Sequence, residues 1–389
     1  MTLLLSEFSG IYYQSSLPLT VILTDATVFV GEKLLRIVPD KRIVLAGQWQ
    51  TIPAVAKLFL QTDAESKILR ERKGLLALDE ANIKTPRVLH FEWTEEHDAY
   101  VIIFEYLDKA VTFKQLWTTT ADDQKYDLLN TLIAITAKLH SHGLYQKDCH
   151  LENFLYENNE ITVIDGATVV KKSKSLNQKN SLDNLAVLMA QFNQPFDHYL
   201  SKIIAQYMQL REWQTDPTLY QWFLKRLTKW RNYRERIYLE KTLRTCTAFI
   251  VDETWHYFCV WDRNYDTPQI RLLLQTPSIL FYRRPEEIFS EENYDATAST
   301  AHESNLVVRR YELNFWQRIK HIFITTPARA AWLELQRQQF IGMPTIQPIA
   351  LIEYRWGIIP KVGYLIVESG ESYVPKSFKS EELDKNNIS

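Results

Sequence analysis

The chain has 389 residues, of which 46% are apolar, and this length is enough for two to three domains with a sizeable core. Its formal net charge of −2 excludes the global positive field that attracts nucleic acid, so we expect no nucleic-acid partner. Three scattered cysteines exclude a disulfide framework, and no 18 apolar residues run together. We therefore expect a cytoplasmic protein that does not span a membrane, although peripheral association stays open.

The first thirty residues alternate weakly between apolar and polar side chains, which predicts an N-terminal strand extension without an assigned function. Residues 34–38 and 42–46 predict a strand pair around a polar turn at 39–41. That turn lacks the Gly-x-Gly of a phosphate-covering loop. No motif in this region therefore supports a nucleotide site.

An almost wholly apolar strand is predicted at residues 54–60, and it contains a single lysine, Lys57. A charge in a half-buried strand is costly unless it is paired, so we expect this lysine to have a partner. Kinases use a lysine at such a position to hold the α and β phosphates of ATP. In the alternative interpretation, Lys57 points outward from an edge strand.

Residues 63–80 predict a helix, and Glu71 lies on the same stripe as the apolar residues Ile68, Leu75 and Leu78. A carboxylate on an inward face needs a cation, and Lys57 is the candidate. Glu65 is an alternative partner for that lysine. Because residues 70–73 are rich in basic side chains, both glutamates would otherwise belong to an ordinary charged surface.

Two further strands are predicted at residues 87–93 and 100–105, after the helix ends near Thr85-Pro86. The segment 104–108 would then link to a second lobe. In this architecture the linker backbone hydrogen-bonds the adenine ring. We place the adenine contacts at Glu105 and Leu107.

The clearest amphipathic helix is predicted at residues 126–140, with a stop at Gly143. His140 and His142 lie near its end, and His150 follows soon after. Without another ligand at short spacing, we interpret them as helix-end or core histidines and not as a zinc site.

The residues that carry chemistry gather between 147 and 166. Asp148 lies five residues before Asn153, and a hairpin of residues 154–156 and 161–164, turning at Asn158-Asn159, would deliver Asp165 at its end. Phosphoryl transfer needs a carboxylate to accept the proton of the attacking hydroxyl and hard oxygen ligands for magnesium. Asp148 suits the first role, and Asn153 and Asp165 suit the second. Each residue alone would be an ordinary cap or loop group, so only the joint spacing predicts a phosphotransfer centre.

Helices are predicted at residues 181–192 and 196–210, followed by a basic helix at 222–236 that is interleaved with aromatic residues. A basic aromatic helix can lie against anionic lipid or an acidic acceptor. Equally, its aromatic residues could pack on the helical lobe and leave its charges in solvent.

These motifs resemble the lipopolysaccharide core kinase family, a bacterial group that phosphorylates inner-core heptose or Kdo sugars. The resemblance covers about residues 31–240 and is strongest at 143–155 and 163–166. It implies an α+β, two-lobed protein kinase-like fold that uses ATP and Mg²⁺. Carried over to this chain, it implies the following roles: Lys57 on phosphate and paired with Glu71, Asp148 as catalytic base, and Asn153 and Asp165 on magnesium.

Three positions depart from the protein kinase pattern. Gln146 replaces the histidine expected before the catalytic loop, and no phenylalanine separates Asp165 from Gly166. His150 stands where kinases of serine and threonine commonly carry a lysine, as in kinases of small molecules. None of these changes removes a catalytic atom.

The segment from 245 resembles the N-terminal lobe of the same family a second time. Residues 306–311 resemble its lysine-bearing strand, 328–332 its helix, 342–345 the following turn and 364–368 its linker. Arg309 then replaces the strand lysine and Ala331 the helix glutamate, so the ion pair cannot form. We expect this unit to be non-catalytic, with a docking, regulatory or acceptor-positioning role, and to pack on the first unit or another chain. A truncated remnant without a present role is the alternative.

The predicted organisation is an N-terminal extension (1–30), a kinase N-lobe (31–106), a C-lobe (107–244), a second N-lobe-like unit (245–376) and a polar tail (377–389). The expected activity is phosphorylation of a lipopolysaccharide core sugar, with peripheral contact at the cytoplasmic face of the inner membrane. A kinase of a protein or another small molecule, and a non-catalytic scaffold, stay open as alternatives. We make no prediction of oligomeric state.

Overall fold

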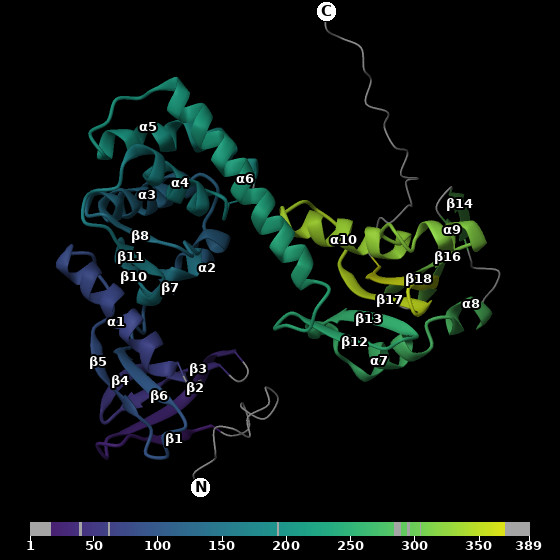
Figure 1. Ribbon diagram of the computed structural model, residues 1–389, viewed down its shortest axis with the longest axis horizontal. Helices are drawn as coiled ribbons and strands as arrows, with labels where there is room; N and C mark the ends of the chain where they lie inside the picture. The colour runs from purple at the N-terminus through teal and green to yellow at the C-terminus, as the bar shows by residue number, and fades with distance from the viewer. Residues whose placement is uncertain are drawn as a thin grey trace, which may run out of the picture. The chain divides into compact units, whose positions relative to one another are not determined.

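The computed structural model describes residues 17–38, 41–60, 63–192, 194–283, 289–293, 296–303 and 305–369. Residues 1–16 of the expected extension, most of the predicted turn (39–40) and the polar tail lie outside the described residues. The chain divides into two compact units, one up to Arg231 and the other from Asn232 (Figure 1). This division falls inside a long helix, whereas the sequence places the boundary at 244.

The first unit begins with a six-stranded antiparallel sheet in the order β1-β2-β3-β4-β6-β5. Its strands are β1 (Leu19–Ile22), β2 (Val28–Val38), β3 (Arg42–Trp49), β4 (Ile52–Phe59), β5 (Val88–Trp93) and β6 (Tyr100–Glu105). Helix α1 (Ala64–Glu80) connects β4 to β5. The strands and the helix predicted between residues 34 and 105 are therefore present.

Alternation along β4 decides where its lysine points. Ala54, Ala56 and Leu58 are fully buried in the cluster on the sheet face away from α1. Because successive side chains of a strand point to opposite faces, Lys57 is directed to the α1 side. The helix presents its buried stripe, including Ile68 and Leu78, to that same side.

A helical lobe completes the first unit. Its helices are α2 (Phe113–Thr119), α3 (Lys125–Ser141), α4 (Gln178–Met189), α5 (Leu200–Leu210) and α6 (Pro217–Lys241). Short strands lie among them: β7 (Val111–Thr112), β8 (Leu144–Gln146), β9 (Phe154–Glu157), β10 (Glu160–Val163) and β11 (Val169–Lys171). The core between α3 and α5 is apolar and includes Leu129, Leu132 and Ile203, all fully buried. A sheet with one helix followed by a helical lobe is the predicted two-lobed, protein kinase-like arrangement, and the fold is α+β.

Helix α6 contains the basic segment predicted at 222–236. Trp222 and Trp230 pack partly buried against the core of the helical lobe. Arg226 is paired with Asp183, and two nitrogens of Arg231 donate to Asp197. The packed interpretation of the aromatic residues is thus the one observed, and membrane contact stays a prediction. Within the described residues, no helix has an apolar stretch long enough to cross a bilayer.

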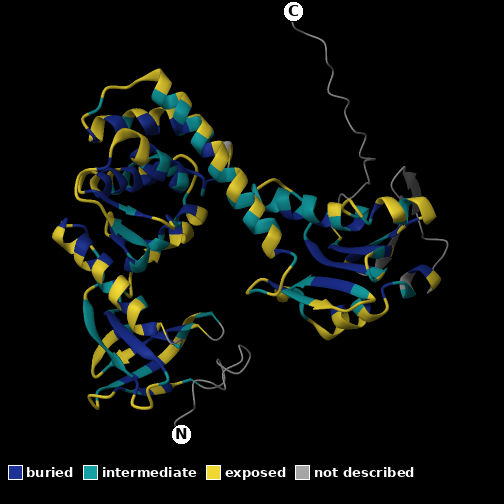
Figure 2. Cartoon of the chain, in the orientation of Figure 1, coloured by how far each residue is buried: buried dark blue, intermediate teal, exposed yellow. Residues whose placement is uncertain are grey.

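The second unit is built on a seven-stranded antiparallel sheet in the order β12-β13-β17-β18-β16-β15-β14. Its strands are β12 (Phe249–Glu253), β13 (Tyr257–Asp262), β14 (Phe289–Asn293), β15 (Ala296–Glu303), β16 (Leu306–Glu312), β17 (Pro348–Trp356) and β18 (Ile359–Glu368). Its helices are α7 (Pro268–Gln275), α8 (Ile279–Arg283), α9 (Phe315–Lys320) and α10 (Pro327–Phe340). Helix α10 covers one face of the sheet and α7 the other, and the central strands are buried (Figure 2).

Five strands of the second sheet repeat the order found in the first. The series β14-β15-β16-β18-β17 corresponds to β2-β3-β4-β6-β5, and in each unit a helix precedes the last two strands. Both sheets also pair the corresponding strands antiparallel, with Lys57 opposite Ile102 in the first unit and Arg309 opposite Leu365 in the second. The residues aligned after the two helices, Asn82 and Gly342, both have positive φ. The interpretation as a second N-lobe stays a prediction.

Candidate active site

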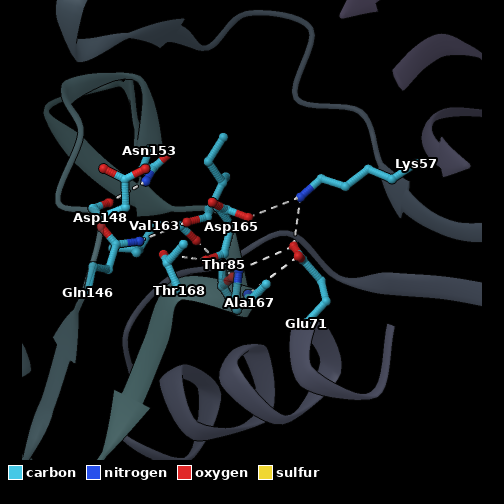
Figure 3. Close-up of polar contacts among 12 residues, drawn as sticks. Lys57, Glu71, Thr85, Gln146, Asp148, Asn153, Val163, Asp165, Ala167 and Thr168 are labelled. Atoms are coloured by element: carbon cyan, nitrogen blue, oxygen red, sulfur yellow. Dashed lines mark hydrogen bonds and ion pairs between the residues drawn. The ribbon is translucent and has the colours of Figure 1, made fainter. Parts of the chain in front are cut away.

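Lys57 and Glu71 form the predicted ion pair between β4 and α1. The Lys57 Nζ lies 2.7 Å from the Glu71 Oε1, and Glu71 is only 1% exposed (Figure 3). The same Nζ is 3.7 Å from a carboxylate oxygen of Asp165. Glu65, the alternative partner, is exposed. The lysine is therefore held between two carboxylates, one from the helix that packs on the sheet and one from the helical lobe.

Glu71 also fixes the turn that follows Asp165. Its two carboxylate oxygens accept hydrogen bonds from the backbone N–H of Gly166 (3.2 Å) and of Ala167 (3.4 Å). The helix approaches this turn closely, since a Cβ on Gly74 would lie 1.9 Å from the carbonyl oxygen of Gly166. Only a glycine at position 74 leaves room for that contact.

Asp165 is delivered by the predicted hairpin of β9 and β10. The turn residues Asn158 and Asn159 both have positive φ, as a tight two-residue hairpin turn requires. Asp165 itself has a left-handed backbone (φ 65°), which is uncommon for a residue other than glycine. Thr168 stabilises it, because its N–H and its hydroxyl both donate to the Asp165 carbonyl.

Asp148 and Asn153 are joined through the loop between them. The Asn153 side-chain nitrogen donates to the Asp148 carbonyl oxygen at 2.8 Å, and the backbone N–H of His150 donates to the same oxygen at 3.0 Å. The Asp148 carboxylate is on an exposed residue, where an acceptor hydroxyl could reach it. Figure 3 shows Asp148, Asn153 and Asp165 together at the end of the hairpin.

The oxygen atoms near the hairpin fit magnesium better than zinc. The hydrogen bond from the Asn153 nitrogen leaves the side-chain oxygen as the ligand atom, and Asp165 adds a carboxylate. Mg²⁺ prefers such oxygen ligands and usually takes only one or two from the protein, with phosphates and water completing the shell. Over the described residues, no three His, Cys, Asp or Glu side chains converge as a metal site.

Gln146 has a structural role that the sequence analysis did not find. Its side-chain nitrogen donates to the carbonyl oxygen of Ile164 at 2.9 Å, and the residue is 1% exposed. The carbonyl oxygen of Gln146 in turn accepts a hydrogen bond from Asn184 at 2.7 Å. Gln146 therefore links the strand before Asp148 to the residue before Asp165. Its position in a buried strand directly before the catalytic loop was the signal in the sequence.

The histidines near this loop are structural. His140 is fully buried, and its ring nitrogens bond the Tyr207 hydroxyl at 2.7 Å and the Asn184 side-chain oxygen at 3.0 Å. Burial is the main cause that lowers the pKa of His140 from 6.5 to about 4. His142 bonds a carbonyl at the helix end, and the His150 ring accepts the N–H of Glu152.

The two predicted adenine-contact residues lie where β6 ends. The Glu105 carboxylate accepts the backbone N–H of Arg87 at 2.9 Å, and the Leu107 carbonyl accepts the N–H of Ala110 at 3.2 Å. Both residues thus belong to the segment between the sheet and the helical lobe. Their contact with adenine stays a prediction.

Comparison with known proteins finds a family match within the first unit. Residues 47–214 match the model of the lipopolysaccharide kinase (Kdo/WaaP) family. The matched segment makes up less than half of the chain. The resemblance predicted from the sequence is confirmed over the range that contains Lys57, Glu71, Asp148, Asn153 and Asp165.

Among solved structures, the chain is similar to WaaP in complex with acyl carrier protein, with 18% identity and a TM-score of 0.36. That alignment covers 51% of this chain and 88% of the WaaP chain. No curated protein matches the sequence.

Proposed function

We propose that the first unit is an ATP- and magnesium-dependent kinase that phosphorylates a hydroxyl of a lipopolysaccharide inner-core sugar, heptose or Kdo. The observation that carries this proposal is the convergence of Lys57, Glu71 and Asp165 within one set of contacts, inside the segment that matches the kinase family. Asp148 and Asn153 stand at the end of the same hairpin.

Each residue has a role in phosphoryl transfer. Lys57, oriented by Glu71, binds the α and β phosphates of ATP. The Asp148 carboxylate orients the acceptor hydroxyl and takes its proton as the new bond to phosphorus forms. Asn153 and Asp165 would hold magnesium, which supplies neutralisation of the phosphate charge. Because Asp165 is also near Lys57, the nucleotide phosphates and the metal ligands share one site.

Because the proposed acceptor is linked to lipid, the proposal also implies that the protein works near a membrane surface. The protein would work at the cytoplasmic face of the inner membrane, in peripheral contact with it. Lys225 and Lys229 are exposed on α6 and can contribute to that contact. Sedimentation with anionic liposomes tests it: replacing both lysines by Glu should weaken binding, and unchanged binding would exclude this face of α6.

For the second unit we propose a non-catalytic N-lobe-like fold with a docking, regulatory or acceptor-positioning role. The repeated strand order and the antiparallel pairing of the corresponding strands support the fold. The residues at the catalytic positions, Arg309 and Ala331, support the absence of phosphate binding. A carboxylate at position 331 would be needed to orient a lysine at 309.

The direct test is transfer of labelled phosphate from ATP to purified, dephosphorylated core lipopolysaccharide, with the wild type and Asp148→Asn compared. Loss of a general base costs about 10²–10⁴ in rate, so transfer by the variant should be nearly absent. Magnesium-dependent stabilisation by ATP should persist in both proteins. Binding without transfer by the wild type would point to a protein or another small molecule as acceptor, and no nucleotide binding would leave the scaffold alternative.

A further inference from the structure

A cavity of about 320 Å³ lies in the helical lobe of the first unit, outside the contacts described above. It is formed by β8, the segment after β11, and helices α4 and α6. Its lining includes two lysines, two aromatic residues and two further polar side chains: Tyr145, Lys147, Lys172, Asn180, Asp183 and Trp230. This mixture of aromatic surface and polar groups is typical of a binding site for a small polar ligand.

The charges in the cavity do not cancel. Its carboxylate, Asp183, is already paired with Arg226 and also accepts the Trp230 Nε1–H at 2.9 Å. Lys147 and Lys172 are both exposed, and neither forms an ion pair with any residue in the described ranges. The cavity therefore offers two positive charges without a counter-charge from the described part of the chain, which suits an anion.

The backbone connects both lysines to the catalytic loop. Lys147 directly precedes Asp148, and its N–H donates to the Thr168 carbonyl at 2.9 Å. The N–H of Lys172 donates to the Gly143 carbonyl at 2.9 Å, at the start of the strand that leads to Asp148. On the floor of the cavity, Asn184 donates to the carbonyl of Gln146. A ligand in the cavity is thus adjacent to the loop that carries the proposed base.

We propose that this cavity is the acceptor subsite, and that Lys147 and Lys172 bind an anionic substituent of the acceptor sugar, a carboxylate or a phosphate. The rings of Tyr145 and Trp230 provide the apolar wall against which a sugar ring can lie. The inference rests on the proposed kinase function and adds what selects the acceptor. Both lysines are positioning residues, because they hold the substrate and take no part in the proton transfer.

The test uses two acceptors with the intact protein: a dephosphorylated core oligosaccharide that retains its Kdo carboxylates, and the same oligosaccharide with these carboxyls reduced to alcohols. Lys172→Ala removes a charge-assisted hydrogen bond to the substituent and should raise KM for the acidic acceptor about tenfold. Its kcat and its KM for ATP should stay near the wild-type values. For the reduced acceptor, Lys172→Ala should behave as the wild type does.

Three further variants and one competition experiment make the result specific. Lys147→Ala should act in the same direction, Lys172→Arg should restore most of the affinity, and Lys179→Ala should change nothing. Lys179 is an exposed lysine of α4 that does not line the cavity. Inorganic phosphate should compete with the acidic acceptor and lose this effect in Lys172→Ala.

Two outcomes overturn the inference while the kinase proposal stands: Lys172→Ala changing KM equally for both acceptors, or changing it for neither. If inorganic phosphate inhibits transfer to the acidic acceptor and to the reduced acceptor equally, the lysines bind a free anion and not the acceptor. This result would also overturn the inference. Failure of the wild type to phosphorylate either acceptor overturns both proposals. That last failure is recognised before any variant is made.

Discussion

The α1 side of β4 and the α10 side of β16 occupy the same place in two sheets of the same strand order, yet they carry different chemistry. In the first unit Lys57 projects from the strand and meets Glu71 of the helix at 2.7 Å. In the second unit Arg309 points to the helix side, between Val307 and Tyr311, but the aligned helix residue is Ala331. The shared strand order therefore does not by itself produce the lysine–glutamate pair.

In the second unit an ion pair also connects the helix to the sheet, but here the cation is on the helix and the anion is on the sheet. Arg329 of α10 supplies the cation, and Glu353 of β17 supplies the anion. Thr326, at the start of the helix, also donates to Glu353, which is only 5% exposed. A buried carboxylate on the sheet and a cation on the helix stabilise the packing, but they do not reproduce the pairing of a strand lysine with a helix glutamate. What distinguishes the two units is which element carries the cation.

The largest expected effect separates the two units by activity. Lys57→Ala should lower kcat/KM about 10²–10³-fold, because the cation on the ATP phosphates is lost. Arg309→Ala should leave kcat/KM within about twofold if the second unit is non-catalytic, as we propose. Steady-state transfer assays on folded, purified variants measure both. A large loss from Arg309→Ala would contradict the non-catalytic assignment of the second unit.

The second expected effect is on stability, and it is confined to the first unit. His140 is neutral when folded, with its pKa lowered from 6.5 to about 4 by burial, whereas the unfolded chain takes up a proton below about 6.5. The free energy of unfolding should therefore fall as the pH drops from about 6.5 to about 4, by up to ~3 kcal/mol. Hydrogen exchange of α3 should show this loss.

The matched measurement is exchange in β18 of the second unit, which should not share that part of the pH dependence. His140→Gln should have a flatter pH profile in α3, even if its stability at pH 7 is lower. An equal slope in the wild type and in this variant would mean that other groups govern the acid sensitivity.

Local patterns were enough to predict much of the first unit. The Asn158-Asn159 turn between two apolar runs predicted the hairpin that delivers Asp165, and the position of Glu71 on an apolar stripe predicted its partner. In both cases the information lies within one element, where spacing fixes the direction of a side chain. The α+β kinase-like fold followed from these motifs and from the family resemblance.

Contacts between distant segments were not predictable in this way. Arg226 pairs with Asp183 across 43 residues, and nothing in the spacing of α6 distinguishes it from an arginine in solvent. The role of Gln146 depends on the carbonyl of Ile164, which only the folded chain brings near. The acceptor cavity is likewise formed by four separate segments.

The smallest expected effect tests the exchanged ion pair of the second unit. Glu353→Gln leaves Arg329 without its anion; because Arg329 is 30% exposed, we expect about 2 kcal/mol of destabilisation and not the ~3–5 kcal/mol of a fully buried pair. The loss of stability is measured by denaturant unfolding, with hydrogen exchange in β17 and β18 as the probe of the second unit. Glu312→Gln is the control, since that carboxylate is half-exposed and pairs with Arg310 at 3.5 Å, a contact that should contribute less than about 1 kcal/mol.

The activity of Glu353→Gln decides what the exchanged pair means. If the second unit only docks or positions, the folded variant should keep its kcat and its KM for ATP, because no nucleotide contact depends on Glu353. A loss of kcat comparable to that of Lys57→Ala, without a loss of folded protein, would show that the second unit supports the chemistry itself. The Arg329–Glu353 pair would then meet a catalytic requirement in a different way from Lys57 and Glu71, and its role would not be limited to packing the helix on the sheet.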